Sequence, residues 1–474
     1  MNYLQHFETD RVVEACIAGA GDFGRGVLRQ ARQMKGFSAR IAIDINPEKA
    51  AEALHHAGIP DTQIMVCHSG KDAEQAWQNG LFIATASFET VQALPFDILV
   101  ESTGIPDVGA RYAEAALLAD KHVGIATKET ESVVGPYLTR LAYQQGRLFT
   151  PLDGDQPSLL IGLLTWAKTL GFEIIAAGKS SEYDFIWDEA SATVTCNGTA
   201  FPAPGLDELW ELPVGRERDV VEARSKLLAA IPQISVPDLC EMVNVANATG
   251  LSPDRPEFHA MILRTTEVPT LLDLQPQGGV LQGPGRLEVF NCLRRPDELS
   301  FAGGVFVVVR CEDPHVWALL RDKGHVLSRN EHSAMIYLPR HLLGLEAPIS
   351  LLDVVLNGLT SGGGHATTPK FDLTARTTQT IKAGQRLEMR GHHRHIEGLR
   401  PELHPAAPLS PTEKVPFYLL PGADVIRDIE PNQPITLADV ALPDSSLKQL
   451  RIKQDELFQH HHPATKVDTT STLA

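Results

Sequence analysis

Residues 19–24 read Gly-Ala-Gly-Asp-Phe-Gly, which is the spacing G-x-G-x-x-G. The first glycine permits a tight turn after a strand, the second lets the backbone approach a pyrophosphate, and the third lets the next helix pack closely. The start of that helix offers free N–H groups and the positive end of its dipole to phosphate. The motif therefore predicts a dinucleotide site formed by Gly19, Ala20, Gly21, Asp22, Phe23 and Gly24.

Asp44 follows the second expected strand, residues 40–43. This is where such folds place the carboxylate that binds a ribose 2′-hydroxyl. A carboxylate there favours NAD and repels the 2′-phosphate of NADP. We therefore expect NAD or NADP as the cofactor, with a preference for NAD. The alternative is a glycine-rich turn that binds nothing.

Two lysines lie at the ends of apolar runs: Lys128 follows residues 122–126, and Lys179 follows residues 173–177. A lysine at the carboxyl end of a strand can hydrogen-bond a substrate carbonyl or exchange a proton with an alcohol. A surface lysine in a loop is the alternative for Lys128. We predict that one or both lysines act on the substrate oxygen.

Acidic and polar residues accompany both lysines. Asp153 and Asp155 precede a predicted helix, where they either cap it or bind substrate or a metal. His341 lies in an apolar stretch, where a structural histidine is the more common outcome. The predicted catalytic residues are Lys128, Lys179, Asp155 and Glu182. The predicted substrate-binding residues are Asp153, Gln156, Ser180 and His341. A divalent metal is an open alternative, with unknown ligands.

Strands alternate with helices over the first 150 residues, which predicts an α/β fold with a doubly wound parallel sheet of the Rossmann type. The carboxyl ends of such strands meet at one rim. This rim would bring the glycine-rich loop next to Ser102, Thr103, Gly104 and Lys128, and we predict that these four residues also bind the cofactor. We expect the Rossmann domain over residues 1–150, an α+β catalytic domain over 151–350, a β-rich domain over 351–459 and a disordered tail over 460–474.

The composition limits the partners. The formal net charge of −17 disfavours nucleic acid. The longest apolar run, residues 158–167, is too short for a membrane span. The first residues lack the pattern of an export signal, and the six cysteines are scattered. We expect a cytoplasmic homo-oligomer that acts on a small molecule, without a nucleic-acid or membrane partner.

Several segments together resemble one known family. They are ESTG at 101–104, TKE at 127–129, DGDQP at 153–157, AAGK at 176–179 and RDIEPNQPITLADV at 427–440. They resemble the homoserine dehydrogenase-like oxidoreductases with a C-terminal SAF domain. The resemblance implies an NAD(P)-binding domain, an α+β catalytic domain and a terminal β-rich SAF module. It also implies that Lys128 lies near the nicotinamide.

The first functional hypothesis is an NAD(P)-dependent oxidoreductase that acts on a small polar hydroxy or oxo compound. One branch of the family resembles deoxyxylulose-phosphate reductoisomerase, which uses NADPH and a divalent metal. An acid at Glu182 would repel the phosphate of such a substrate, and Asp44 fits NADPH poorly. A third hypothesis, from another class, is a non-catalytic protein that senses a dinucleotide or a sugar.

Overall fold

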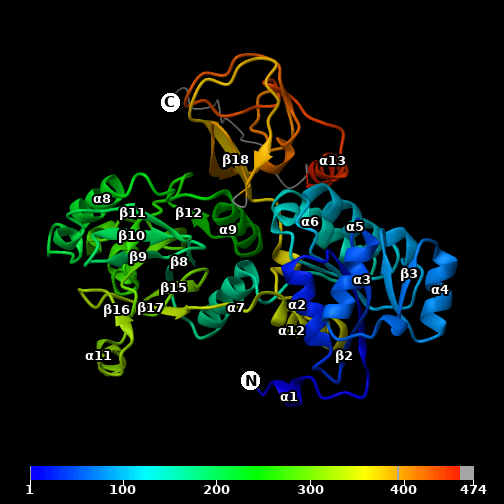
Figure 1. Ribbon diagram of the computed structural model, residues 1–474. Helices are drawn as coiled ribbons and strands as arrows, with labels where there is room; N and C mark the ends of the chain where they lie inside the picture. The colour runs from blue at the N-terminus through cyan, green and yellow to red at the C-terminus, as the bar shows by residue number, and fades with distance from the viewer. Residues whose placement is uncertain (1, 392–393, 459–474) are drawn as a thin grey trace, which may run out of the picture.

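The computed structural model describes residues 2–391 and 394–458. Figure 1 shows three regions: an N-terminal parallel sheet, a middle region around a mixed sheet, and a C-terminal β-rich region above the other two. The predicted fold class is confirmed. The predicted tail, residues 460–474, lies outside the described residues.

The N-terminal sheet has seven strands in the order β3-β4-β2-β1-β5-β6-β7, and every pairing is parallel. Its strands are β1 (Val13–Ala18), β2 (Phe37–Ile43), β3 (Ile64–Cys67), β4 (Phe82–Thr85), β5 (Ile98–Glu101), β6 (His122–Ile125) and β7 (Phe149–Pro151). Its helices are α2 (Asp22–Ala31), α3 (Pro47–His56), α4 (Gly70–Gln78), α5 (Pro106–Leu118) and α6 (Lys128–Gln144), after a short α1 (Tyr3–His6). The strand order reverses between β1 and β5, and ligands of open parallel sheets bind at such a point.

The middle region is built on a ten-stranded mixed sheet whose main order is β11-β10-β9-β14-β8-β15-β17-β16. Its strands are β8 (Ile174–Ser180), β9 (Phe185–Asp188), β10 (Thr193–Cys196), β11 (Thr199–Pro202), β12 (Ser252–Pro253), β13 (Ile262–Leu263), β14 (Arg286–Arg294), β15 (Val305–Arg310), β16 (Val326–Leu327) and β17 (Ser333–Leu338). Its helices are α7 (Gln156–Thr169), α8 (Glu217–Leu227), α9 (Val236–Thr249), α10 (Val268–Leu271) and α11 (Pro314–Asp322). Strand β8 is central, and all seven of its residues are buried.

Helix α9 joins the three regions. It packs against α6 of the N-terminal region, α7 of the middle region and β18 (Phe371–Thr377) of the C-terminal region. Twelve of its fourteen residues are buried, and Gly250 ends it in the left-handed conformation, with φ +77°. The helix is apolar enough to enter the core, so its few acidic and amide residues must find partners there.

After the middle region the chain returns to the N-terminal sheet. The 3₁₀ turn η6 (Leu343–Leu345) lies across α2, and α12 (Pro348–Leu352) contributes Leu351 and Leu352 to the core beneath β1 and β2. Gly344 packs so closely on α2 that a Cβ there would overlap the carbonyl oxygen of Phe23. The segment 339–346 therefore connects the middle region with the start of the dinucleotide-type loop.

The C-terminal region pairs its strands antiparallel. It contains β18, β19 (Met389–Arg390), β20 (His395–Ile396), β21 (Leu399–Pro405), β22 (Asp424–Val425), β23 (Val440–Ala441) and α13 (Ser446–Phe458). Helix α13 packs on α5 and α6, where Gln454 Nε2 donates to Val133 O at 3.0 Å. The C-terminal region is thereby fixed to the N-terminal one.

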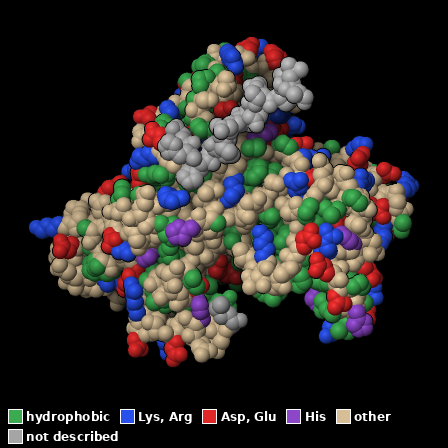
Figure 2. Space-filling view, turned by 180° about the vertical axis from the view of Figure 1, so that it is seen from behind, with side chains coloured by type: hydrophobic (Ala, Val, Ile, Leu, Met, Phe, Trp, Pro, Cys, Tyr) green, Lys and Arg blue, Asp and Glu red, His purple; other side chains and the backbone are tan. Residues whose placement is uncertain are grey.

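The surface seen from behind carries charged side chains of both signs, interspersed with apolar ones (Figure 2). All six cysteines are free. Across residues 2–391 and 394–458, the helices are all too short or too polar to cross a lipid bilayer.

Candidate active site

The glycine-rich loop connects β1 to α2 with the geometry that the sequence predicts. Gly19 has φ +102°, and a Cβ there would overlap the backbone of Ser102. A Cβ on Gly24 would overlap the carbonyl oxygen of Gly19. By contrast, the space beside Gly21, the N-cap of α2, is open, and no side chain caps this helix start. Gly19 and Gly24 thus allow the close packing of the loop, and Gly21 leaves the backbone at the start of α2 accessible to a ligand.

Asp44 follows β2 and lies beside this loop. Its carboxylate accepts hydrogen bonds from the N–H groups of Ala20 and Asn46, both at 3.2 Å. These contacts orient the carboxylate at the carboxyl rim of the sheet. The loop and Asp44 together fit the phosphates and a ribose of a dinucleotide.

The residues after β5 lie next to the same loop. Ser102 Oγ donates to Ala18 O at 2.9 Å, and Thr103 Oγ1 donates to Glu101 Oε1 at 2.6 Å. The N–H of Gly104 donates to Thr127 Oγ1 at 3.0 Å. The two predicted side chains Ser102 and Thr103 therefore support the rim through protein contacts, and their role toward a cofactor stays a prediction.

Lys128 and Lys179 come from different sheets and meet at one carboxylate. Glu241 of α9 accepts from Lys128 Nζ with one oxygen and from Lys179 Nζ with the other. Asp238, one helical turn earlier, accepts from Lys179 Nζ at 2.6 Å. Asp155 Oδ1 lies 3.8 Å from Lys128 Nζ. Three of these five residues, Lys128, Lys179 and Asp155, were predicted from separate segments of the sequence, and Glu241 of α9 brings the two lysines together.

The two lysines differ in their access to the cavity. The side chain of Lys128 is 22% exposed, whereas that of Lys179 is 1% exposed and enclosed by two carboxylates. A group that acts on substrate must touch it. Lys128 is therefore the better placed of the two, and Lys179 positions Glu241.

The carboxylates control the charge on Lys128. Burial favours the neutral amine, but Asp155 and Glu241 outweigh it and raise the pKa of Lys128 well above its ordinary value. Burial also disfavours charge on Glu241, yet Lys128 and Lys179 lower the pKa of this carboxyl. At neutral pH the Lys128 side chain is thus an ammonium, which donates hydrogen bonds.

Asp155 is different, because burial raises its pKa in spite of the opposing effect of Lys128. Its side chain also accepts from the N–H of Gln156 at 3.0 Å and caps α7. A carboxyl group with a raised pKa next to an ammonium is suited to proton exchange with a substrate. The two interpretations of Asp155 from the sequence, capping and chemistry, are compatible in this geometry.

A cavity of about 470 Å³ opens beside these groups. Besides the two lysines and Asp155, its walls include Gln156, Glu182, His341 and Leu343. Among the described residues, Gln156 Oε1 and His341 Nδ1 are buried without a hydrogen-bond partner. Such orphaned polar atoms at a cavity wall are suited to binding a ligand.

Asp153 and Ser180, the other two predicted substrate-binding residues, lie outside the lining of this cavity. Ser158 Oγ donates to Asp153 Oδ1 at 2.8 Å, and Ser350 Oγ accepts from the Asp153 N–H at 2.7 Å. Ser180 is fully buried on β8. Neither residue is among those that line the cavity. Their contact with substrate stays a prediction.

The C-terminal region closes the cavity with Arg394. Its Nε lies 2.9 Å from Glu129 Oε1, and its guanidinium reaches Gly104. Met389 and Gly391 of the same region also line the cavity. The sequence analysis missed this contribution, because nothing in the local pattern places residue 394 near residue 129.

The sequence analysis also missed Asp238, Glu241 and Asn244, which are spaced i, i+3 and i+6 along α9. Asn244 Nδ2 donates to the carbonyl oxygen of Lys128 at 3.1 Å. The available signal was two acids followed by amides at steps of three residues along a largely apolar helix, since buried charges need partners.

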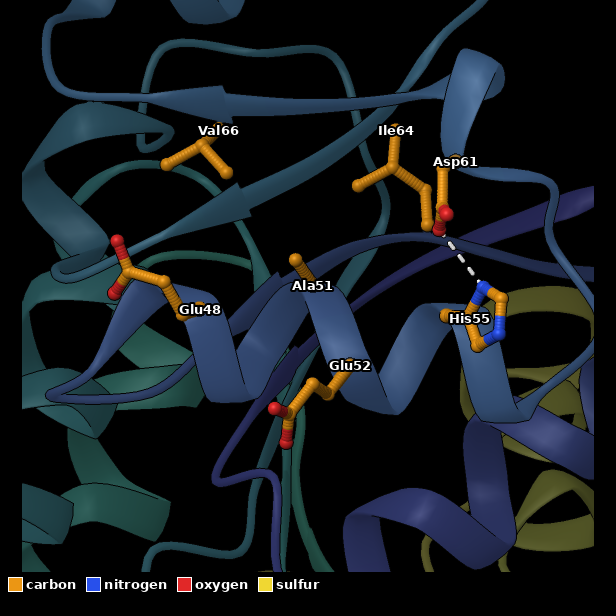
Figure 3. Close-up of a pocket in the computed structure, with 7 residues that line it drawn as sticks. All are labelled: Glu48, Ala51, Glu52, His55, Asp61, Ile64 and Val66. Atoms are coloured by element: carbon orange, nitrogen blue, oxygen red, sulfur yellow. Dashed lines mark hydrogen bonds and ion pairs between the residues drawn. The ribbon is translucent and has the colours of Figure 1, made fainter.

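Two further features bear on the site. Within the described residues, no group of three or more His, Cys, Asp or Glu side chains is arranged to hold a metal ion. Figure 3 shows another pocket, of about 400 Å³, between α3 and the edge strand β3. It is lined by Glu48, Ala51, Glu52, His55, Asp61, Ile64 and Val66, and includes none of the predicted residues.

Comparisons with known proteins assign the middle region. Residues 154–347, less than half of the chain, match the family described as "Oxidoreductase DRL, catalytic domain". This region is therefore similar to an oxidoreductase catalytic domain. A search of curated proteins found no match.

Solved structures show weaker likeness. A DOX-P reductoisomerase bound to NADPH, fosmidomycin and magnesium is 15% identical, over 38% of this chain and 48% of that one, with a TM-score of 0.27. An NAD-binding protein from Listeria innocua is 22% identical, over 38% and 47%, with a TM-score of 0.25. The 1-deoxy-D-xylulose 5-phosphate reductoisomerase from Zymomonas mobilis, bound to NADPH, is 14% identical, over 50% and 58%, with a TM-score of 0.29. The chain thus spans about half the length of these structures.

Proposed function

We propose that this protein is an NAD(P)-dependent oxidoreductase that acts on a small polar hydroxy or oxo compound. One observation carries the proposal: Lys128, at the carboxyl rim of the Rossmann-type sheet, faces a cavity together with Asp155. The similarity of residues 154–347 to an oxidoreductase catalytic domain supports the same reaction class.

The glycine-rich loop and Asp44 would hold the dinucleotide. When bound, it supplies or accepts the hydride. Because Asp44 carries a carboxylate beside the Ala20 N–H, we propose that NAD is preferred over NADP. The specific kinship with homoserine dehydrogenase-like SAF proteins, the domain limits and the homo-oligomeric state stay predictions.

In the proposed reaction, Lys128 donates a hydrogen bond to the substrate oxygen. The ammonium stabilises negative charge on that oxygen during reduction of a carbonyl, and it retains a donor when the alcohol is formed. Asp155 supplies or removes the proton through its contact with Lys128. Gln156 and His341 offer unpartnered polar atoms to neighbouring hydroxyl groups.

The charge of the cavity favours an unphosphorylated substrate. Five acidic residues line it (Glu129, Asp155, Glu182, Asp238 and Glu241), against three cations (Lys128, Lys179 and Arg394). The cations are paired with these acids. A phosphate would enter against a net negative lining, so the reductoisomerase alternative receives no support from the cavity.

Cofactor titration tests the proposal. We expect NADH to bind more tightly than NADPH when followed by fluorescence, and a panel of polyols, hydroxy acids and oxo acids to contain a compound that is turned over. Asp44→Ala should weaken NADH binding by about 10- to 100-fold, because it removes a charged hydrogen-bond acceptor. Asp219→Ala, at an exposed position of α8 in the middle region, is the matched control. Failure of both cofactors to bind would overturn the proposal, and tighter NADPH binding would overturn the assigned preference.

A further inference from the structure

A second cavity, of about 490 Å³, lies beside the candidate active site. Glu182 and Asp238 line both cavities. The C-terminal region covers both as well: Met389 and Arg394 border the first, and Leu399 and Arg400 border the second. The two cavities are therefore adjacent, and the C-terminal region borders both.

The second cavity is mainly apolar. Phe185 of β9, Phe201 of β11, Ile231 and Ile234 before α9, and Leu399 of β21 lie in its wall. Its volume is in the range of pockets that bind small molecules. An apolar group of a ligand that is buried in this cavity would gain the free energy of burial.

Two polar side chains in the inner part of this wall, Asn291 and Ser235, have protein partners. Asn291 Nδ2 donates to Gln233 O at 3.0 Å and to Ala260 O at 2.8 Å. Ser235 Oγ donates to Asp238 Oδ2 at 2.6 Å. In the first cavity, by contrast, Gln156 Oε1 and His341 Nδ1 have no partner within the described part of the chain. The first compartment thus offers polar contacts, and the second offers apolar surface.

Asp238 fixes the boundary between the compartments. Lys179 holds one of its carboxylate oxygens, and Ser235 holds the other. Because both oxygens are engaged, this side chain is a rigid part of the wall. A ligand whose reacting oxygen lies at Lys128 would extend past Asp238 into the apolar space.

From this arrangement we infer that the second cavity binds the apolar, uncharged end of the substrate whose hydroxyl or oxo group reacts at Lys128. The inference rests on the proposed function and narrows the substrate class. The substrate is amphipathic, with a hydroxylated head and an alkyl or aryl tail. Each buried methylene should strengthen binding about fourfold, which corresponds to about 0.8 kcal/mol.

The test uses the 1,2-alkanediols from propane-1,2-diol to octane-1,2-diol as probes. Their affinities for the full chain are measured by calorimetry, with and without NADH. We expect affinity to rise about fourfold per added methylene until the cavity is full. Thr199→Trp, an exposed position in the cavity wall on β11, should remove this dependence on chain length.

Ala200→Trp is the matched control, since this neighbour is also exposed on β11 but does not line the cavity. It should keep the dependence on chain length. A flat series, or equal slopes in the wild type and Thr199→Trp, would overturn the inference. Because the diol series is also measured without NADH, a protein that binds diols but no cofactor would refute the proposed function separately.

Discussion

The ends of β6 and β8 each present a lysine to the same carboxylate, yet the two lysines have different surroundings. At the end of β6, Lys128 begins α6 and reaches a cavity between three regions. On β8, Lys179 is flanked by β14 and β15 and enclosed by Asp238 and Glu241. Residue type and position relative to a strand are thus insufficient to identify a catalytic lysine. What distinguishes Lys128 from Lys179 is the access of its side chain to the cavity.

The difference follows from the sheets themselves. The rim of a parallel sheet at its switch point is an open crevice, because the flanking connections diverge there. Strand β8 lies in the interior of the mixed sheet and α7 packs on it, so a charge on this strand is buried and must be paired, here with Asp238 and Glu241 of α9. The rim of the parallel sheet therefore favours a catalytic lysine, whereas the interior of the mixed sheet favours a structural ion pair.

The substitution with the largest expected effect is Lys128→Met. It removes the hydrogen-bond donor to the substrate oxygen and keeps the length of the side chain. Turnover of the compound identified in the substrate panel should fall by about 10²- to 10⁴-fold, as is typical for loss of an acid–base group. Steady-state kinetics measures this effect, while NADH titration should stay close to the wild type. Wild-type turnover by this variant would contradict the assignment of Lys128.

The same substitution at the second lysine, Lys179→Met, should act mainly on stability. It leaves Asp238 with only Ser235 as a partner and removes one of the two cations from Glu241. Breaking a buried ion pair costs about 3–5 kcal/mol in the free energy of unfolding. Urea unfolding measures this change in the free energy of unfolding. Lys168→Met, at an exposed position of α7, is the control. Unchanged stability with lost turnover would instead make Lys179 catalytic.

The two lysines also show how much of the site could be predicted from the sequence. Hydrophobic runs and the glycine spacing sufficed to predict the parallel sheet, because strand and helix periodicity are local properties. Both lysines could be predicted as candidates for the same reason. Glu241 and Arg394 could not, since their contacts join residues more than 100 positions apart. The different exposure of Lys128 and Lys179 likewise depends on how the three regions pack.

The proline-rich residues 401–416 illustrate the same limit. Five prolines favour an extended chain there, and much of it is irregular. Its beginning, however, belongs to β21, which pairs antiparallel with β18. Proline is tolerated at such positions in a two-stranded ladder because one edge of the strand needs no donor. Which extended segment gains a partner is a matter of tertiary structure.

The last prediction concerns Glu288, a buried titratable group of the mixed sheet whose effect depends on pH. Glu288 lies on β14 opposite Gly178 of β8, and its Oε2 accepts from the His259 N–H at 3.0 Å. Burial raises the pKa of this carboxyl to about 8. Between its ordinary pKa and pH 8, the folded protein therefore retains a proton that the unfolded chain has released. Stability contributed by the protonated form is lost as the pH rises through this window, by at most about 1.4 kcal/mol per pH unit.

Glu288→Gln keeps the acceptor for the His259 N–H and removes the titration. Relative to the wild type, this variant should gain stability in urea unfolding between pH 5 and pH 8, while turnover stays unchanged. Glu312→Gln, at an exposed position, should show no such gain. A parallel pH dependence of Glu288→Gln and the wild type would show that Glu288 is ionised in the folded protein. Together with normal turnover, the expected gain would show that this buried carboxyl of the mixed sheet affects stability rather than chemistry, unlike Lys128 at the rim of the parallel sheet.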